Sequence, residues 1–250
     1  MLKVSKDIPL ENLVSRQMKF WESVGKTKEK SDTPQVWPCI TISREIGSQG
    51  AKLAMLLAER LGWQVFDKEI VDYIANHAKV RKNIVELFDG KARNEFNSWL
   101  VTILDSHSLS SDRFFKHLVT TIMSIGQHGR AIILGRGANF ILPDNKALKL
   151  RVVAPLHQRI DFIQSEMGID AAHAESVIKK MQNERNAFVK RYFRAKPDAT
   201  HHYDLILNMG KMDLTTAQAA VVGAVTAKFG IKESILRNKV AKSELVQAVM

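Results

Sequence analysis

The sequence has little of what disulfide-bonded or membrane-spanning proteins require. One cysteine among 250 residues, Cys39, excludes an internal disulfide, and its apolar surroundings favour an inert core thiol. The apolar runs fall well short of the about 20 residues that cross a bilayer. Residues 1–7 lack the apolar segment of a secretory signal. We therefore expect a cytoplasmic protein that does not contact a membrane.

Aromatic residues are also scarce, and acidic residues are outnumbered by basic ones. Aromatics make up 7% of the chain, and the excess of lysine and arginine gives a net charge of +11. Such a surface attracts anions, either phosphorylated metabolites or nucleic acid. Nucleic acid is the weaker choice, because the sequence offers few aromatic side chains for stacking and no recognition motif. The histidines show no metal-ligand spacing, so we expect no metal held by the protein's own side chains.

One segment carries most of the functional signal. It runs Cys39-Ile-Thr-Ile-Ser-Arg-Glu-Ile-Gly-Ser-Gln-Gly50 and leads into a stretch in which Leu53, Leu57 and Leu61 recur every four residues. A β-branched strand, a glycine-containing turn and a helix build phosphate-binding loops, because their backbone N–H groups converge on the anion. A purely structural strand-to-helix turn is the alternative. The predicted phosphate-binding residues are Arg44, Gly47, Ser48, Gln49, Gly50, Ala51 and Lys52.

The loop departs from the usual phosphate-binding pattern G-x-x-x-x-G-K-[ST]. Arg44 stands in the position of the first glycine and Gly50 in that of the lysine. Arg44 and Lys52 could neutralise phosphate in place of the missing lysine. Alternatively, Arg44 pairs with Glu45 or another acid, and Lys52 is solvated. A cation in a first helical turn opposes the helix dipole unless an anion lies there, which favours a partner for Lys52.

Helical and extended segments alternate along the chain, which predicts an α/β fold with a largely parallel sheet flanked by helices. Ligands of such sheets bind at the carboxyl ends of the strands, where Ser43, Asp67, Gly135 and Asn208 fall. An N-cap is expected at Ser111 or Asp112. The expected strands are at about 37–43, 64–66, 131–134, 148–153 and 204–207. The expected helices are at about 50–61, 68–78, 156–166 and 170–194, over a region at 81–127, and from Thr215.

Four parts of the chain, in this order, resemble the cytidylate kinase-like family. They are Ile40–Gly50 with Leu56–Lys68, then Ala131–Pro143, Glu184–Phe193 and Tyr203–Gly210. The resemblance spans about residues 36–225 and implies a P-loop nucleotide-kinase fold with a helical lid. A helical extension and polar linker (1–35) would precede this domain, and a helical tail (226–250) would follow it.

The resemblance also implies roles for single residues. Arg136 matches a Gly-Arg-Asp motif that contacts the monophosphate substrate, although a surface arginine is the alternative. Asp67 stands where cytidylate kinases turn toward the acceptor nucleotide, and it could equally be a helix N-cap. Arg185 and Arg191 lie on a segment that resembles the lid, whose arginines stabilise charge during transfer; a solvated basic face is the alternative. The predicted acceptor-binding residues are Asp67 and Arg136, and the predicted catalytic residues are Lys52, Arg185 and Arg191.

The function that the resemblance implies is ATP-dependent phosphoryl transfer, with ATP and Mg²⁺ as cofactors. A nucleoside monophosphate is the simplest acceptor. Activity on CMP does not follow, because Gly50, Lys52, Tyr73 and Gly137 replace groups that cytidylate kinases use. Since the loop lacks its lysine and hydroxyl, a nucleotide-binding sensor that keeps the fold with little catalysis is the alternative.

The two ends of the chain carry apolar stripes, and the polar linker at 25–34 would let the first helix reach a second copy. We therefore predict a homodimer, with packing onto the same chain as the alternative. Deleting residues 1–30 should convert the dimer to a monomer in light scattering without loss of nucleotide binding. A full-length chain that is monomeric at high concentration would contradict the prediction.

Overall fold

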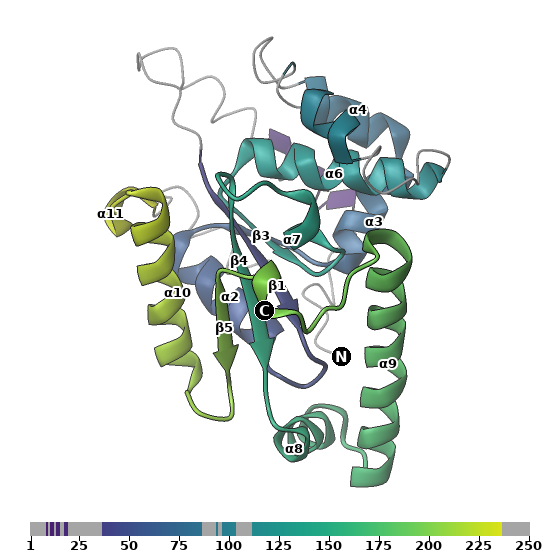
Figure 1. Cartoon of the computed structure of the whole chain (residues 1–250), viewed down its shortest axis with the longest axis vertical. Helices are drawn as coiled ribbons and strands as arrows, with labels where there is room; N and C mark the ends of the chain where they lie inside the picture. Colours follow the sequence, from purple (N-terminus) through teal and green to yellow (C-terminus); the bar gives the residue numbers. More distant parts are fainter. Residues whose placement is uncertain are drawn as a thin grey trace.

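Five parallel strands form the centre of the molecule (Figure 1). The computed structural model describes residues 9, 11–12, 14–15, 18–19, 37–86, 94, 97–103 and 112–236. The strands lie in the order β2-β3-β1-β4-β5, and each neighbouring pair is parallel, which confirms the predicted sheet. Their bounds are β1 Cys39–Arg44, β2 Gln64–Phe66, β3 Ala131–Leu134, β4 Ala147–Val153 and β5 Leu205–Asn208.

Helices cover both faces of the sheet. On one face lie α2 (Gly50–Leu61), α10 (Leu214–Phe229) and α11 (Glu233–Leu236). On the other side lie α3 (Lys68–Asn76), α4 (Ala78–Glu86), α6 (Arg113–His128) and α7 (Ala138–Ile141). Side chains of a strand alternate between faces, so Ile40 and Ile42 pack with α2 and α10 whereas Cys39 packs with α6. Burial raises the pKa of the Cys39 thiol to about 12, as an inert core thiol requires.

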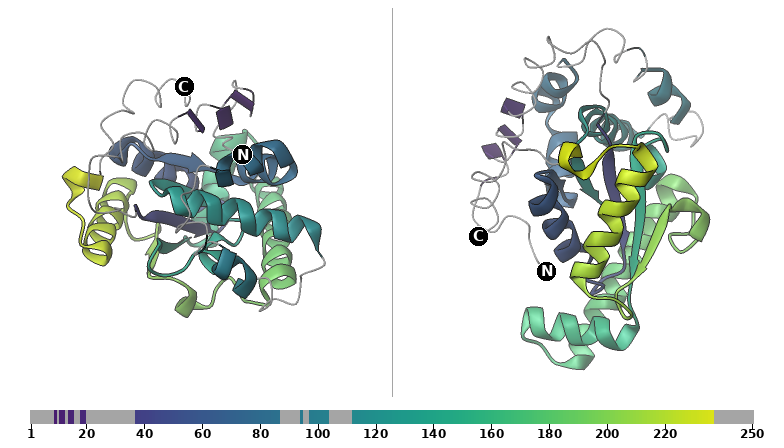
Figure 2. Two further views of the ribbon diagram at one scale, coloured as in Figure 1. Left: turned by 90° about the horizontal axis from the view of Figure 1, so that it is seen from above. Right: turned by 90° about the vertical axis from the view of Figure 1, so that its left-hand side faces the viewer.

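A hairpin of two helices, α8 (Leu156–Met167) and α9 (Ala171–Phe193), projects from one end of the sheet (Figure 2). Its small core joins Ile163 and Ile178 to Ile46 of the loop after β1. At the other end of α9, the Phe193 ring stacks on Phe140 of α7 with 4.9 Å between ring centroids. The hairpin therefore reaches from the β1 loop to the region after β3, in the place predicted for a lid. A 3₁₀ turn (Thr200–His202) then leads into β5.

The predicted helix boundaries hold at several positions and shift at others. The carboxylate of Asp112 accepts a hydrogen bond from Phe115 N at 3.0 Å and caps α6, so one of the two predicted caps is confirmed. Ser111 lies outside the described residues. The helical region expected over 81–127 is divided, because α4 ends at Glu86 and α6 begins at Arg113, with a further helical stretch at 97–103. α10 runs through the domain boundary expected at residue 225.

The described parts of both chain ends pack on the core. Val14 is buried in the same cluster as α6, and Met18 packs against that cluster. Trp63 Nε1 donates to the Leu236 carbonyl at 2.9 Å and fixes α11. Several apolar residues near the two ends, such as Leu10 and Trp21, lie outside the described residues, so the homodimer stays a prediction. Within the described ranges, no helix combines the length and apolar character needed to cross a bilayer.

The cap of α6 can be tested with two substitutions at one position. Asp112 caps α6 and also pairs with Arg191 of α9 at 3.5 Å. Asp112→Ala removes both contacts and should lower the free energy of unfolding by about 1 kcal/mol. Asp112→Asn keeps a capping side chain and loses only an exposed ion pair, so its stability should stay near that of the wild type. Urea unfolding followed by circular dichroism measures both, and equal destabilisation would assign the effect to the ion pair.

Candidate functional site

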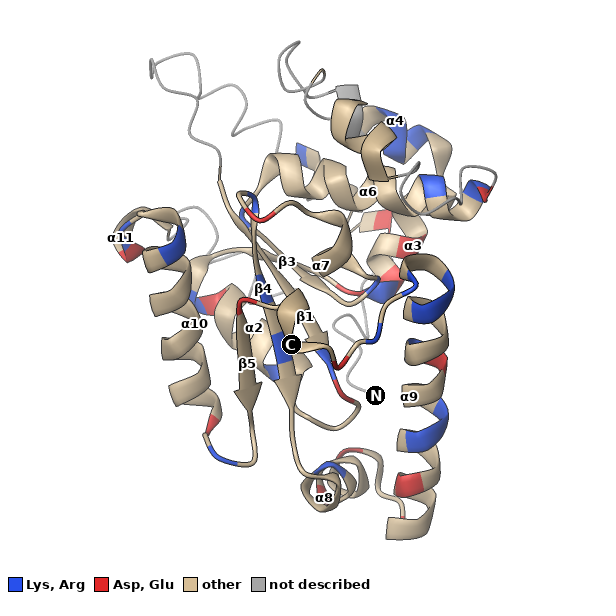
Figure 3. Ribbon diagram, in the orientation of Figure 1, with Lys and Arg blue, Asp and Glu red and all other residues tan. Residues whose placement is uncertain are grey.

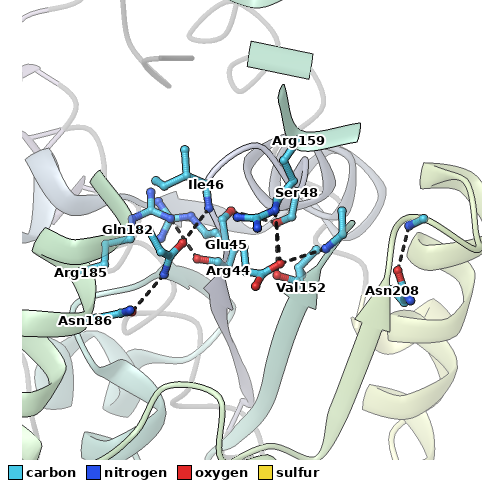
Figure 4. A network of polar contacts seen from close by, with 12 residues as sticks. Arg44, Glu45, Ile46, Ser48, Val152, Arg159, Gln182, Arg185, Asn186 and Asn208 are labelled. Atoms are coloured by element: carbon cyan, nitrogen blue, oxygen red, sulfur yellow. Dashed lines mark hydrogen bonds and ion pairs between the residues drawn. The ribbon is translucent and has the colours of Figure 1, made fainter. Parts of the chain in front are cut away.

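A cavity of 260 Å³ opens where the carboxyl ends of β1, β2 and β3 face α9. Three of the residues expected at strand ends line it, namely Ser43, Asp67 and Gly135. Asn208 does not line it; its side-chain oxygen accepts a hydrogen bond from Gly210 N at 3.0 Å in the turn after β5 (Figure 4). The polar and charged lining residues are Ser43, Arg44, Asp67, Lys68, Glu69, Arg136, Asn139, Arg151, Gln182, Glu184, Arg185 and Asn186.

The side chain of Arg44 passes between two glycines beside this cavity. A methyl group added at Gly50 would lie 2.8 Å from Arg44 Cβ, and one added at Gly135 would lie 2.7 Å from Arg44 Nη1. Real side chains do not approach other atoms this closely, so a side chain at position 50 would collide with the base of the Arg44 side chain. At position 135 it would meet only the end of the guanidinium, but the backbone there has φ +77°, a conformation that favours glycine. Gly50 is the position at which the usual pattern has its lysine. The Arg44 chain occupies the space beside that position instead.

The loop between β1 and α2 presents backbone N–H groups to the surroundings. Ser48 Oγ lies 3.0 Å from the Glu45 carbonyl oxygen and 3.2 Å from that of Val152, which ties the loop to β4. Gly50, Ala51 and Lys52 open α2, and within the described residues their N–H groups have no acceptor. These groups and the dipole of α2 favour an anion in front of the helix, so the phosphate-binding role of the loop stays a prediction that this geometry allows.

Side chains of the α8–α9 hairpin bond to this loop (Figure 4). Ile46 N donates to Gln182 Oε1 at 3.1 Å, and Arg185 Nη1 donates to the Arg44 carbonyl oxygen at 3.0 Å. Glu45 Oε2 accepts from Ala154 N at 3.1 Å and lies 3.7 Å from Arg159 Nε. Glu45 is therefore paired with α8, and the pairing of Arg44 with Glu45 that the sequence left open is not found.

Three guanidinium groups of the lining have no carboxylate partner. Among the described residues, Arg44, Arg151 and Arg185 have no carboxylate oxygen within 4.0 Å. Burial lowers the pKa of both Arg44 and Arg185, and the charges of Arg44 and Arg151 lower that of Arg185 further. Because arginine keeps its proton in proteins, the shifts mean that the fold buries these charges at a cost, which the more distant carboxylates of Asp67 and Glu69 offset only in part. An anion in the cavity would remove that cost.

Two residues predicted to act in catalysis lie away from the cavity. Lys52 Nζ pairs with Glu166 of α8 at 2.8 Å and borders a second, smaller cavity of 120 Å³ between loop and hairpin. The Arg191 side chain is 69% exposed and pairs with Asp112. Lysines and arginines recur along α9 (Figure 3), but of these only Arg185 lines the larger cavity. The geometry thus separates Arg185 from Arg191.

Asp67 and Arg136, predicted to bind the acceptor, both line the larger cavity. Asp67 also caps α3 by accepting from Ile70 N at 3.0 Å, and burial raises the pKa of its carboxyl group. Arg136 forms an ion pair with Asp72 of α3, and its Cζ lies 4.9 Å from the centroid of the Phe188 ring on α9. These contacts hold Arg136 in one place between α3 and α9, so it is not a free surface arginine.

Among the polar lining side chains that the sequence did not single out, two are buried, Arg151 of β4 and Asn139 of α7. Each is only 6% exposed, and Asn139 Nδ2 has no hydrogen-bond partner within the described residues. Arg151 did carry a signal, since it is a charge in a mostly apolar strand and charged groups are rarely buried without a purpose. Asn139 carried none, because nothing in the sequence marks the one-turn helix that holds it.

Comparison with known proteins agrees with this architecture. Residues 39–211, well over half of the chain, match the cytidylate kinase-like family. The chain belongs to this family. It therefore has the P-loop nucleotide-kinase fold that the sequence predicted, with a five-stranded parallel sheet flanked by helices.

Individual similar proteins add little about function. A solved structure of an uncharacterized protein from Eubacterium ventriosum shares 24% identity and a TM-score of 0.60, over 76% of this chain and 98% of that one. Shikimate kinase from Bacteroides thetaiotaomicron shares 11% identity and a TM-score of 0.38, over 78% of this chain and 99% of that one. A uronate isomerase from Corynebacterium glutamicum is 22% identical over 157 residues, or 58% of this chain. The chain spans only 30% of that relative's length.

Gly50→Ala tests whether Arg44 must occupy the space beside Gly50. The added methyl group would lie 2.8 Å from Arg44 Cβ, so the Arg44 chain has to move. A lost charged hydrogen bond to phosphate costs about 1.5–3 kcal/mol, so ATP affinity measured by calorimetry should fall at least about tenfold. Gly223→Ala in α10 is the matched control, because an added methyl group meets nothing within 4 Å there. Unchanged ATP affinity in a folded Gly50→Ala variant would contradict the predicted role of Arg44 in phosphate binding.

Proposed function

We propose that the larger cavity is the active site of an ATP-dependent phosphotransferase with a small phosphorylated acceptor, most simply a nucleoside monophosphate. The observation that carries the proposal is the convergence of four arginines in front of α2. They come from β1, the turn after β3, β4 and α9, and are Arg44, Arg136, Arg151 and Arg185. Phosphoryl transfer depends on positioning and on stabilising charge spread over phosphoryl oxygens. Guanidinium groups suit both tasks, because they bind phosphate in a bidentate fork.

The donor phosphates would bind at the loop, where the N–H groups of Gly50, Ala51 and Lys52 and the Arg44 side chain are available. Magnesium usually reaches such sites on the nucleotide and uses one or two carboxylates rather than an all-protein cage. The chain fits that mode: Asp67 and Glu69 line the cavity, and within the described residues no three His, Cys, Asp or Glu side chains gather to hold a metal. Neither Ala51 nor Lys52 offers the hydroxyl that the usual pattern places after its lysine.

The acceptor would be recognised mainly through its anionic group. Phe188 is the aromatic residue of the described lining, and the Arg136 guanidinium already lies over its ring. A nucleobase that stacked on Phe188 would therefore compete with that guanidinium for the ring. Asn139 and Asp67 supply polar groups beside Arg136. This lining favours an acceptor defined by its phosphate, with weak discrimination among bases.

A nucleotide-binding sensor is the second candidate, and one contact favours it. Lys52, the cation in the first turn of α2, is already neutralised by Glu166 of α8. If that ion pair persists with nucleotide bound, the loop offers neither a lysine nor a hydroxyl to the transferring phosphoryl group. Nucleotide would then bind without efficient transfer.

Incubation with ATP, Mg²⁺ and each nucleoside monophosphate, with chromatographic detection of diphosphate, tests the transferase. Arg185→Ala should lower kcat at least about a hundredfold with little change in ATP affinity, because arginines that meet developing charge act mainly in the transition state. The same assay on Arg191→Ala decides whether that exposed side chain reaches the site. An unchanged kcat would exclude Arg191 from catalysis. ATP binding without any diphosphate formation would overturn the transferase and support the sensor.

A further inference from the structure

Arg151 is a buried cation in the middle of the sheet. It lies on β4, directly beside Ser43 of β1 in the strand register, and is 6% exposed. A buried charge without a counterion is destabilising, and Arg151 has no carboxylate oxygen within 4.0 Å in the described part of the chain. A buried charge without a counterion is typical of functional positions, where a bound ligand supplies the opposite charge.

Its guanidinium is held on one side only. Nη1 donates to Ser43 Oγ at 2.9 Å, and Tyr203 Oη lies 3.2 Å from the same oxygen. Tyr203 Oη also lies 2.6 Å from the Pro197 carbonyl oxygen, which fixes the tyrosine. Arg151 Nε and Nη2 have no hydrogen-bond acceptor among the described residues. The contacts set the orientation of the guanidinium and leave donors for a ligand in the cavity that Arg151 lines.

Arg151 is close to the other two unpaired arginines. The charges of Arg44 and Arg151 both act on Arg185, and all three line the same cavity. Their supports differ, however. Arg44 and Arg151 are carried by central strands of the sheet, whereas Arg185 is carried by α9 of the projecting hairpin. The positions of the Arg44 and Arg151 backbones are therefore set by the sheet and not by the hairpin.

We propose that Arg151 is a fixed anion-binding residue of the cavity, where it binds phosphoryl oxygens together with Arg44 and next to Arg185. The identity of the ligand as a phosphate ester or anhydride rests on the proposed function. Donors that are already oriented when charge develops need no reorganisation, so a strand-borne arginine is well suited to this task. Arg151 thereby adds a permanent charge to a site whose loop has no lysine at position 50.

Binding of inorganic pyrophosphate to the full chain, measured by calorimetry, tests this role without requiring turnover. Arg151→Met keeps an unbranched buried chain and removes the charge, so the affinity should fall about tenfold or more. Lys180→Ala removes one charge from the exposed face of α9 and serves as the control matched in net charge. It should bind pyrophosphate within about twofold of the wild type.

Two results would overturn the proposal. One is wild-type affinity in an Arg151→Met variant whose circular dichroism shows that it is folded. The other is an equal loss of pyrophosphate affinity in Lys180→Ala, which would show that the effect comes from the net charge of the protein and not from Arg151 itself. If Arg151→Met does not fold, Arg151→Gln, which keeps a donor for Ser43 Oγ, takes its place under the same criteria.

The proposed function can fail separately from this proposal. Pyrophosphate binding that depends on Arg151, without diphosphate formation by the wild type, would reject the transferase and keep the anion site. Full turnover and binding in Arg151→Met would keep the transferase and reject the anion site.

Discussion

The arrangement of the cavity depends on one steric constraint, the passage of the Arg44 side chain between Gly50 and Gly135. Through it, the end of β1, the start of α2 and the turn after β3 share one side chain. The carbonyl group of Arg44 also receives Arg185 from α9, so the hairpin is tied to the same residue. The donor loop, the turn that carries Arg136 and the hairpin are thus mechanically connected. A shift of the Arg44 side chain would therefore change the positions of the donor loop, the turn that carries Arg136 and the hairpin.

Arg44 is also one of several positively charged residues that line the cavity and repel one another. Arg44, Arg151 and Arg185 are close to one another, partly or fully buried, and without carboxylate partners in the described chain. The hydrophobic clusters on both faces of the sheet must offset their repulsion when no ligand is bound. A polyanion that binds the folded state alone would act as the missing counterion and stabilise the fold by mass action. Stability and ligand binding are therefore linked through the same three charges.

Local sequence patterns predicted the framework but not the pairing of charges within it. The strand-turn-helix around Gly50, the short strand at 64–66 and the cap at Asp112 each follow from a few neighbouring residues. The ion pair of Lys52 with Glu166 joins residues far apart in the chain and depends on how the hairpin docks. The separation of Arg185 from Arg191 likewise depends on where α9 crosses the cavity. The sequence assigned both arginines to one lid segment, but it could not say which one faces the site.

The loop that looks degenerate in the sequence has a steric explanation in the structure. In the usual pattern, glycine opens the loop and lysine stands six residues later. Here Arg44 stands at the first position and Gly50 at the second, so the cation and the glycine have exchanged places. The exchange is coupled, because any side chain at position 50 would collide with Arg44 Cβ. A lysine restored at position 50 would therefore displace Arg44 rather than add to it. The absence of the lysine is consequently a poor argument against phosphate binding, since the residue that excludes it brings a positive charge of its own.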